Sequence, residues 1–184
     1  LKKFMAILKI LKFPDERLRI KATPVVDFDF DLKKLANDMA DTMYNAPGIG
    51  LAATQVNIHM RIIVVDITSE KKDLKVLVNP YLTNKSANLK VHEEGCLSVP
   101  GIFEEVKRPD LVEIAYQDLD GKTCRLSADG LLSVCIQHEM DHLLGKVFVD
   151  YLSRLKQSRI RKKINKGKHS NSKELNLELS EPLN

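Results

Sequence analysis

The spacing of apolar and polar residues along the chain predicts a series of helices and strands, and the first clear element is a helix. Between residues 31 and 45, apolar side chains recur at the i, i+3, i+7 and i+11 spacing of one helix face. These side chains are Leu32, Leu35, Met39 and Met43. Asp31 stands at the start of this stripe and can cap the helix. We expect the striped face to pack into the core.

The middle of the chain has the pattern of strands. Residues 61–67 are rich in β-branched side chains and predict a strand, and residues 74–78 predict its partner. We expect the partner to end at Asn79-Pro80, because proline cannot donate a ladder hydrogen bond. Residues 81–91 predict a further strand.

The second half of the chain predicts a hairpin followed by two helices. Residues 111–116 and 123–126 flank a turn signal and predict a β-hairpin. Residues 131–144 are apolar on nearly every face, which indicates a buried helix, and residues 155–166 predict a basic helix. Runs of strands followed by helices indicate the α+β class.

The buried helix carries an H-E-x-x-H sequence, His138-Glu139-Met140-Asp141-His142. Positions i and i+4 share a helix face, so both imidazoles can reach one cation, and Glu139 can point at a water on that cation. The alternative is two surface histidines on an amphipathic helix. The apolar neighbours favour the metal, because buried polar side chains are costly without partners. Gly145 then offers a stop for the helix.

The third ligand must come from elsewhere, and Cys96 is the best candidate. A thiolate binds divalent cations well, and Gly95 before it lets the backbone turn tightly. Cys135 is better placed to fill core, and Cys124 falls in a hairpin strand. His92, beside two glutamates, has the pattern of a solvated surface residue.

Residues 48–50, Gly-Ile-Gly, offer a stretch where backbone can approach a ligand closely. They do not extend to a dinucleotide-binding fingerprint, since a preceding strand and a third glycine are missing. Gln55 follows a run of small residues and has both a donor and an acceptor. From the residues alone, a structural role for Gln55 is favoured.

Composition places the chain among ordinary globular proteins. Of its 184 residues, 43% are hydrophobic and 29% charged, and the net charge of +4 does not by itself imply nucleic acid. Three cysteines do not form a disulfide framework, and we expect a cytoplasmic protein without a secretory signal or a membrane span. Residues 1–166 predict one domain, and residues 167–184 a polar, disordered tail.

Three blocks stand in one order along the chain: 48–55 (GIGLAATQ), 94–98 (EGCLS) and 138–142 (HEMDH). Together they closely resemble peptide deformylase in its bacterial type I form. The likeness runs from about residue 7 to about residue 164 and takes in residues 13–18 and 129–132. The resemblance implies an α+β fold, with β-sheets packed around a central helix that carries H-E-x-x-H and with N-terminal and C-terminal helices. It implies a hydrolase of protein biosynthesis that removes the N-formyl group from formyl-methionine of nascent polypeptides, releasing formate.

The resemblance also implies one divalent metal per chain, held by Cys96, His138 and His142 with water as the fourth ligand. Iron, as Fe(II), is expected first, while Ni, Co or Zn can occupy such a site. Glu139 is then the general base and acid for attack of the metal-bound water on the formyl carbon.

Two further parts of the site are expected on the same grounds. The Gln55 side chain and the backbone N–H of Leu97 would stabilise the developing oxyanion. Carried over onto this sequence, the substrate-binding residues of the family are Ile49, Gly50, Gly95, Leu131, Val134 and Cys135, with the His138 ring completing the methionine pocket.

One position departs from the family pattern. Relatives often carry an arginine shortly after the cysteine block, and Phe103 stands there in this chain. Preference beyond the first substrate residue is therefore open. Arg108 can pair with Glu94 or be a solvated surface residue.

The basic stretch 156–168 has two interpretations, a solvated helix face or docking on ribosomal RNA. No DNA and no membrane partner is expected. The competing functions are a metallopeptidase with the same pentad and a ribosome-associated binding protein with structural zinc. Cys96 as a ligand disfavours the first, and an open metal position would disfavour the second.

Overall fold

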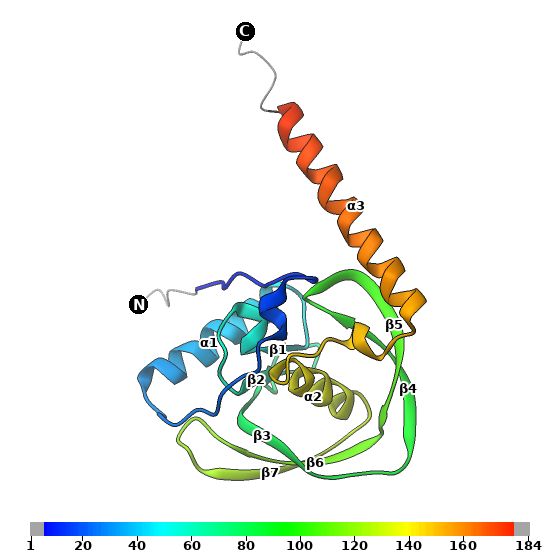
Figure 1. The fold of residues 1–184 in the computed structure, drawn as a ribbon. Helices are drawn as coiled ribbons and strands as arrows, with labels where there is room; N and C mark the ends of the chain where they lie inside the picture. The colour runs from blue at the N-terminus through cyan, green and yellow to red at the C-terminus, as the bar shows by residue number, and fades with distance from the viewer. Residues whose placement is uncertain (1–5, 179–184) are drawn as a thin grey trace. The chain divides into compact units, whose positions relative to one another are not determined.

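The computed structural model in Figure 1 describes residues 6–178, with side chains described up to residue 166. Internal contacts divide the chain into two compact units, Leu1–Phe148 and Val149–Asn184. The expected domain of residues 1–166 crosses this division, and its extent stays a prediction. All the predicted site residues belong to the first unit.

The first unit holds most of the secondary structure. In chain order its elements are η1 (Glu16–Arg19), α1 (Phe30–Asn45), β1 (Gly50–Ala52), η2 (Ala53–Val56), β2 (Ile62–Val65), β3 (Lys75–Lys85), β4 (Leu89–Cys96), β5 (Val99–Pro109), β6 (Leu111–Gln117), β7 (Thr123–Asp129) and α2 (Gly130–Leu143). A short helix, η3 (Phe148–Tyr151), spans the division, and α3 (Arg154–Glu178) belongs to the second unit. The α+β class predicted from the sequence is confirmed.

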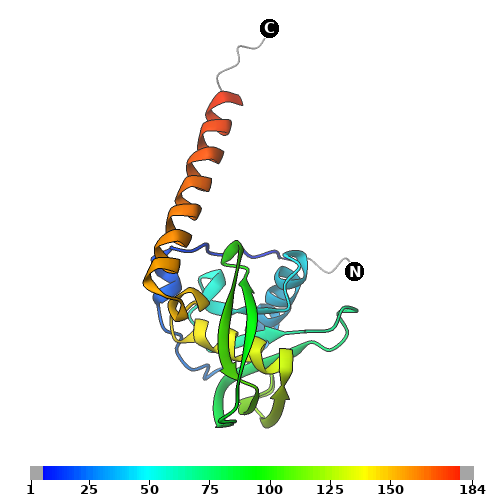
Figure 2. The same cartoon turned by 90° about the vertical axis from the view of Figure 1, so that its right-hand side faces the viewer.

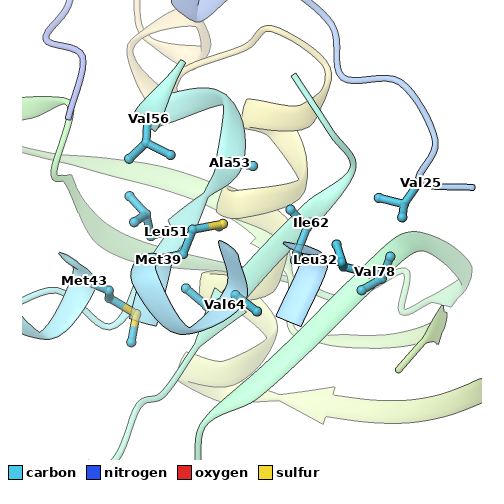
Figure 3. Close-up of a cluster of buried hydrophobic side chains, with 11 residues drawn as sticks. Val25, Leu32, Met39, Met43, Leu51, Ala53, Val56, Ile62, Val64 and Val78 are labelled. Carbon is cyan, nitrogen blue, oxygen red and sulfur yellow. The ribbon is translucent and has the colours of Figure 1, made fainter. Parts of the chain in front are cut away.

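An antiparallel five-stranded sheet in the order β1-β2-β3-β6-β7 forms the frame, and β4 and β5 form a separate two-stranded sheet. Successive side chains of a strand point to opposite faces. Ile62 and Val64 accordingly pack into the cluster with α1 drawn in Figure 3, while Ile63 and Val65 pack into the cluster that contains α2 side chains. Because both faces are covered, β2 is apolar along its whole length.

Helix α1 buries the predicted stripe, but its N-cap lies two residues before the expected one. Asp29, not Asp31, is the N-cap, and its carboxylate accepts a hydrogen bond from the Leu32 N–H at 2.9 Å. Asp31 lies inside the first turn, where its negative charge interacts favourably with the positive end of the helix dipole. Met39 and Met43 are fully buried as predicted.

Strand β3 continues through Asn79-Pro80, where the sequence predicted its end. The pairing register with β6 shifts between Val78 and Tyr81, and Asn79 has a φ of 50°. A proline is tolerated at such an irregularity, because the ladder hydrogen bond is already missing there. The Asn79 side chain compensates by donating to the carbonyl oxygen of Val25 at 2.8 Å.

Helix α2 is the central element of the first unit. It packs against β1, β2, β6 and β7 of the large sheet and against β5 of the small one, and Figure 2 shows the β4–β5 hairpin beside it. Its side chains from Ser133 to Glu139 are buried, as the apolar pattern predicted. Gly145 follows the helix with a φ of 73°, and a Cβ there would lie 2.3 Å from the Arg19 carbonyl oxygen. The predicted stop at Gly145 is thus confirmed.

Helix α3 is longer than the sequence predicted. The N–H of Lys156 lies 3.4 Å from Ser153 Oγ near its start, and the helix runs to Glu178 rather than ending near Lys166. No proline interrupts residues 154–178, which removes the strongest helix breaker. The side chains after residue 166 and all of residues 179–184 lie outside the described part, so disorder of the tail stays a prediction. Over residues 6–178, no helix combines the length and the apolar character that a bilayer span requires.

Replacing Asp29 with Ala should lower the free energy of unfolding by about 1 kcal/mol, because the Leu32 N–H loses its acceptor. Asp31→Ala is the matched control and should cost less, since only a dipole interaction is lost. Urea unfolding of both variants at equal metal content measures the difference. A larger loss in the Asp31 variant would contradict the assigned cap.

Candidate metal centre

A cysteine sulfur and two imidazoles of a helix distant from it in the sequence lie close together. Cys96 stands at the end of β4, while His138 and His142 lie one turn apart on α2. Their ligand atoms all lie within 4.8 Å of one another, and Cys96 Sγ is 3.2 Å from His142 Nε2. Among the described residues, the group able to hold a metal ion consists of these three side chains. It does not include Cys124, Cys135 or His92.

The donor set fits a divalent transition metal. One soft sulfur and two imidazole nitrogens suit Fe(II), Ni, Co or Zn, and three protein ligands leave a coordination position open. Glu139 supports the fit independently, because its Oε2 is buried without a hydrogen-bond partner in the described part of the chain. A buried carboxylate oxygen of this kind is costly unless something else occupies the site.

A buried ion-pair network orients the first histidine. Glu94 and Arg108 are each only 4% exposed, and Arg108 donates to both carboxylate oxygens of Glu94 at 2.5 and 2.9 Å. His138 Nδ1 lies 2.8 Å from Glu94, which leaves Nε2 for a cation. Arg108 also donates to Asp141 at 2.8 Å. Of the two roles expected for Arg108, the pairing with Glu94 is confirmed.

The charge of Glu94 is stabilised by its partners. Burial acts to raise the pKa of Glu94, but hydrogen bonds from His138 and Arg108 outweigh it and hold the pKa below its ordinary value of 4.5. The side chain is therefore a carboxylate at neutral pH, as a hydrogen-bond acceptor for His138 requires.

Glu139 has the opposite environment. It is 4% exposed, and burial raises its pKa to about 7 because the surroundings disfavour the charged form. The side chain lies against β1, where a Cβ on Gly50 would stand 2.5 Å from Glu139 Oε1. A side chain at position 50 would therefore displace this carboxylate from its present place beside the strand.

Gln55, in the short helix η2, lies beside the ligand sulfur. Its Oε1 accepts a hydrogen bond from the Ala52 N–H at 2.8 Å. Its Nε2 donates to Ser98 Oγ at 3.1 Å and lies 3.6 Å from Cys96 Sγ. The residues alone favoured a structural role for Gln55. The chain fold also brings its amide nitrogen beside the ligand sulfur, and a role in the reaction stays a prediction.

A cleft of about 590 Å³ opens beside the three donors. Its wall contains the predicted catalytic and ligand side chains Cys96, His138 and Glu139, whereas Gln55 and His142 are not part of that wall. All six residues expected to bind substrate line it, and they are Ile49, Gly50, Gly95, Leu131, Val134 and Cys135. Leu97 and Phe103 line it as well. Lys12 also lines the cleft and was not singled out, because its position depends on the path of the N-terminal segment.

Comparison with known proteins agrees with this geometry. The family model described as polypeptide deformylase matches residues 7–158. The chain is 55% identical to peptide deformylase 1 of Burkholderia multivorans over 165 residues, covering 90% of this chain and 91% of the relative. It is also 55% identical to the peptide deformylase of Pseudomonas aeruginosa, over 88% of this chain and 96% of the relative.

A crystal structure of a peptide deformylase from Legionella pneumophila superimposes with a TM-score of 0.85 at 46% identity, covering 96% of this chain and 100% of that one. The resemblance found in the sequence is therefore confirmed over most of the length. The chain belongs to the polypeptide deformylase family, the metal-dependent enzymes that remove the N-formyl group from nascent polypeptides.

Proposed function

We propose that this chain hydrolyses the formamide of formyl-methionine at the N-terminus of nascent polypeptides, using the residues that line its metal centre. The observation that carries the proposal is that the Cys96 sulfur and two imidazoles converge beside the buried carboxylate of Glu139, which lines an open cleft. Membership of the deformylase family supports the same reaction.

Cys96, His138 and His142 would hold one divalent cation, with Fe(II) as the working metal. Such a cation acts as a Lewis acid and lowers the pKa of a water molecule bound to it. Ni, Co or Zn would fit the same donors. The hydrogen bond between His138 Nδ1 and Glu94 supports this assignment, since it fixes the ring orientation that a ligand needs.

Glu139 is the proposed general base and general acid. It takes a proton from the attacking water, whose oxygen forms a bond to the formyl carbon. As the bond between carbon and nitrogen breaks, Glu139 returns the proton to the leaving amine. The products are formate and a free methionine amino terminus.

The negative charge that develops on the formyl oxygen needs donors. The Gln55 amide, 3.6 Å from Cys96 Sγ, lies within reach of an oxygen held beside that sulfur. The N–H of Leu97, in the turn after β4, is the second proposed donor. Donors of this kind are each worth about 2.7–4 kcal/mol of transition-state stabilisation in other enzymes.

The methionine side chain would occupy the apolar part of the cleft, between Ile49, Leu131, Val134 and Cys135. The substrate backbone would pair with β1, which is an edge strand of the large sheet and is therefore open to an added strand. A pocket of this kind should discriminate only modestly between methionine, norleucine and leucine.

Phe103 should decide contacts beyond the first residue. Its side chain is 64% exposed at the cleft, and its ring covers Gly95, where a Cβ would lie 2.5 Å from a ring carbon. An arginine at this position could donate hydrogen bonds to substrate carbonyl groups, but a phenyl ring can only make apolar contact. We therefore expect weaker backbone recognition downstream of methionine and better binding of apolar side chains there.

The two competing functions fit less well. A metallopeptidase with this pentad would use a carboxylate or histidine as its third ligand, and here the third donor is Cys96. A structural zinc site would be closed by four protein ligands, and the group in the described residues offers three beside a cleft.

Glu139→Ala should abolish formate release from a formyl-Met peptide while the protein still binds one metal ion. The carboxylate that moves the proton is lost, but the three ligands remain. Glu93→Ala is the matched control, because Glu93 is an exposed carboxylate that lines the same cleft. It should retain activity. Near-normal turnover by the Glu139 variant would refute its role as the base.

Iron-loaded protein should lose activity in air, and nickel-loaded protein should not. Fe(II) and the Cys96 thiolate can both be oxidised, whereas the nickel form lacks a readily oxidised metal. The measurement is formate release against time under air and under nitrogen, with metal content assayed in parallel. Equal air stability of the two forms would count against iron as the working metal.

We also propose that α3 docks on ribosomal RNA in the cytoplasm, where nascent chains emerge. Its exposed basic side chains, Arg159 and Lys162 among them, suit a phosphate backbone. Reversing both to Glu should reduce co-sedimentation with ribosomes and leave turnover of a free formyl peptide unchanged. The control reverses Lys21 and Lys85, two exposed lysines of the first unit. Unchanged co-sedimentation of the α3 variant would refute docking, and the basic residues would then simply form a solvated helix face.

A further inference from the structure

The N-terminal segment 11–13 makes hydrogen bonds to two segments beside the metal centre, one at Gln55 and one at residues 97–98. The N–H of Leu11 donates to the carbonyl oxygen of Gln55 at 2.7 Å, and the N–H of Phe13 donates to that of Ser98 at 2.8 Å. Between them, Lys12 Nζ donates to the carbonyl oxygen of Leu97 at 2.6 Å. The bonds of Leu11 and Phe13 are made by backbone atoms and do not depend on the side chain. The bond of Lys12 is made by the side chain and therefore depends on the lysine.

Lys12 differs from an ordinary surface lysine. Its side chain reaches the wall of the substrate cleft, although the residue as a whole is exposed. Burial lowers the pKa of its ammonium group from the usual 10.5, an effect that the nearby Cys96 thiolate partly offsets. Ordering a long, flexible side chain against one carbonyl oxygen costs conformational entropy, which a solvated lysine would avoid.

The carbonyl that Lys12 binds belongs to the same peptide group as the N–H of Ser98. That N–H lies 3.4 Å from Cys96 Sγ. Because a peptide group is planar, its oxygen and its hydrogen cannot turn independently. Lys12 and Cys96 therefore hold opposite ends of one rigid unit, the peptide group between residues 97 and 98.

We propose that Lys12 is a positioning residue that holds the 97–98 peptide group so that its N–H stays directed at Cys96 Sγ. A hydrogen bond to a thiolate draws charge from the sulfur, and such bonds tune the metal that the sulfur binds. A sulfur that donates less charge leaves a stronger Lewis acid, which would favour deprotonation of the attacking water. The effect on turnover rests on the proposed function, whereas the effect on the peptide group does not.

The test compares Lys12→Met, which keeps the apolar stem but removes the charge and the donor, with Lys12→Arg, which restores both. Lys9→Met is the matched control, because Lys9 is an exposed lysine three residues before Lys12. Three quantities are measured: hydrogen exchange of the Ser98 amide in metal-free protein, the sulfur-to-metal charge-transfer band of Co(II)-loaded protein, and kcat and KM for a formyl-Met peptide.

In Lys12→Met, we expect the Ser98 amide to exchange about tenfold faster, the change that follows when one hydrogen bond no longer holds it. The cobalt band should move to longer wavelength because the sulfur is richer in charge. The value of kcat should fall severalfold while KM changes less than twofold. Lys12→Arg should restore all three, and Lys9→Met should match the wild type.

The proposal is overturned if exchange and cobalt band in Lys12→Met coincide with those of the wild type, or if Lys12→Arg fails to restore them. A fall in activity without either change would also contradict it, since the effect would then not pass through the 97–98 peptide group. If the wild type releases no formate, the proposed function is refuted. Hydrogen exchange of the Ser98 amide would then still decide whether Lys12 holds the 97–98 peptide group.

Discussion

The metal centre depends on one buried carboxylate, that of Glu94. A charge with so little solvent contact is tolerable only if it is paired and hydrogen-bonded. Arg108 supplies two hydrogen bonds to it, and His138 supplies a third contact. Arg108 is itself buried and also donates a hydrogen bond to Asp141 on α2. The network thus joins the β4–β5 hairpin to α2, and removing either charge of the Glu94–Arg108 pair would break a buried ion pair.

Pairing of this kind brings together residues that are far apart in the chain. Glu94 lies two residues before Cys96, and Asp141 lies on the same helix as the two histidines. The same ion pair that attaches the hairpin to the helix therefore also sets the distance between the thiolate and the imidazoles. Two glycines leave room for the close approach of neighbouring side chains. Gly50 admits the Glu139 carboxylate against β1, and Gly95 admits the Phe103 ring.

The sequence predicted the parts of this arrangement that have local signals. The two histidines share a helix face through their spacing, and the apolar residues around them predicted burial. The sequence predicted the ends of helices and strands less well, because tertiary contacts decide where these elements begin and end. Asp29 rather than Asp31 caps α1. The sequence could not decide between them, because either aspartate can cap a helix by its local chemistry. Strand β3 passes Pro80 because Asn79 makes compensating bonds to segments distant in sequence.

Residues whose role depends on the fold were the hardest to find. Gln55 has no pattern that marks it until η2 brings its amide to Cys96, and Lys12 is one exposed lysine among many until the N-terminal segment passes the cleft. The resemblance to deformylases supplied a role for Gln55. Nothing local would have supplied one for Lys12, because the bond that singles it out joins residues that are 85 positions apart.

The most direct test of the central claim is the product formed from one peptide that carries both a formyl group and ordinary peptide bonds. Protein prepared without oxygen and loaded with Fe(II) or Ni(II) is incubated with a formyl-Met peptide and with its N-acetyl counterpart. Formate and peptide masses are then measured together. The account predicts formate and an intact deformylated peptide from the first substrate, and no product from the second. Cleavage of internal peptide bonds, or no formate from protein with verified metal content, would contradict it.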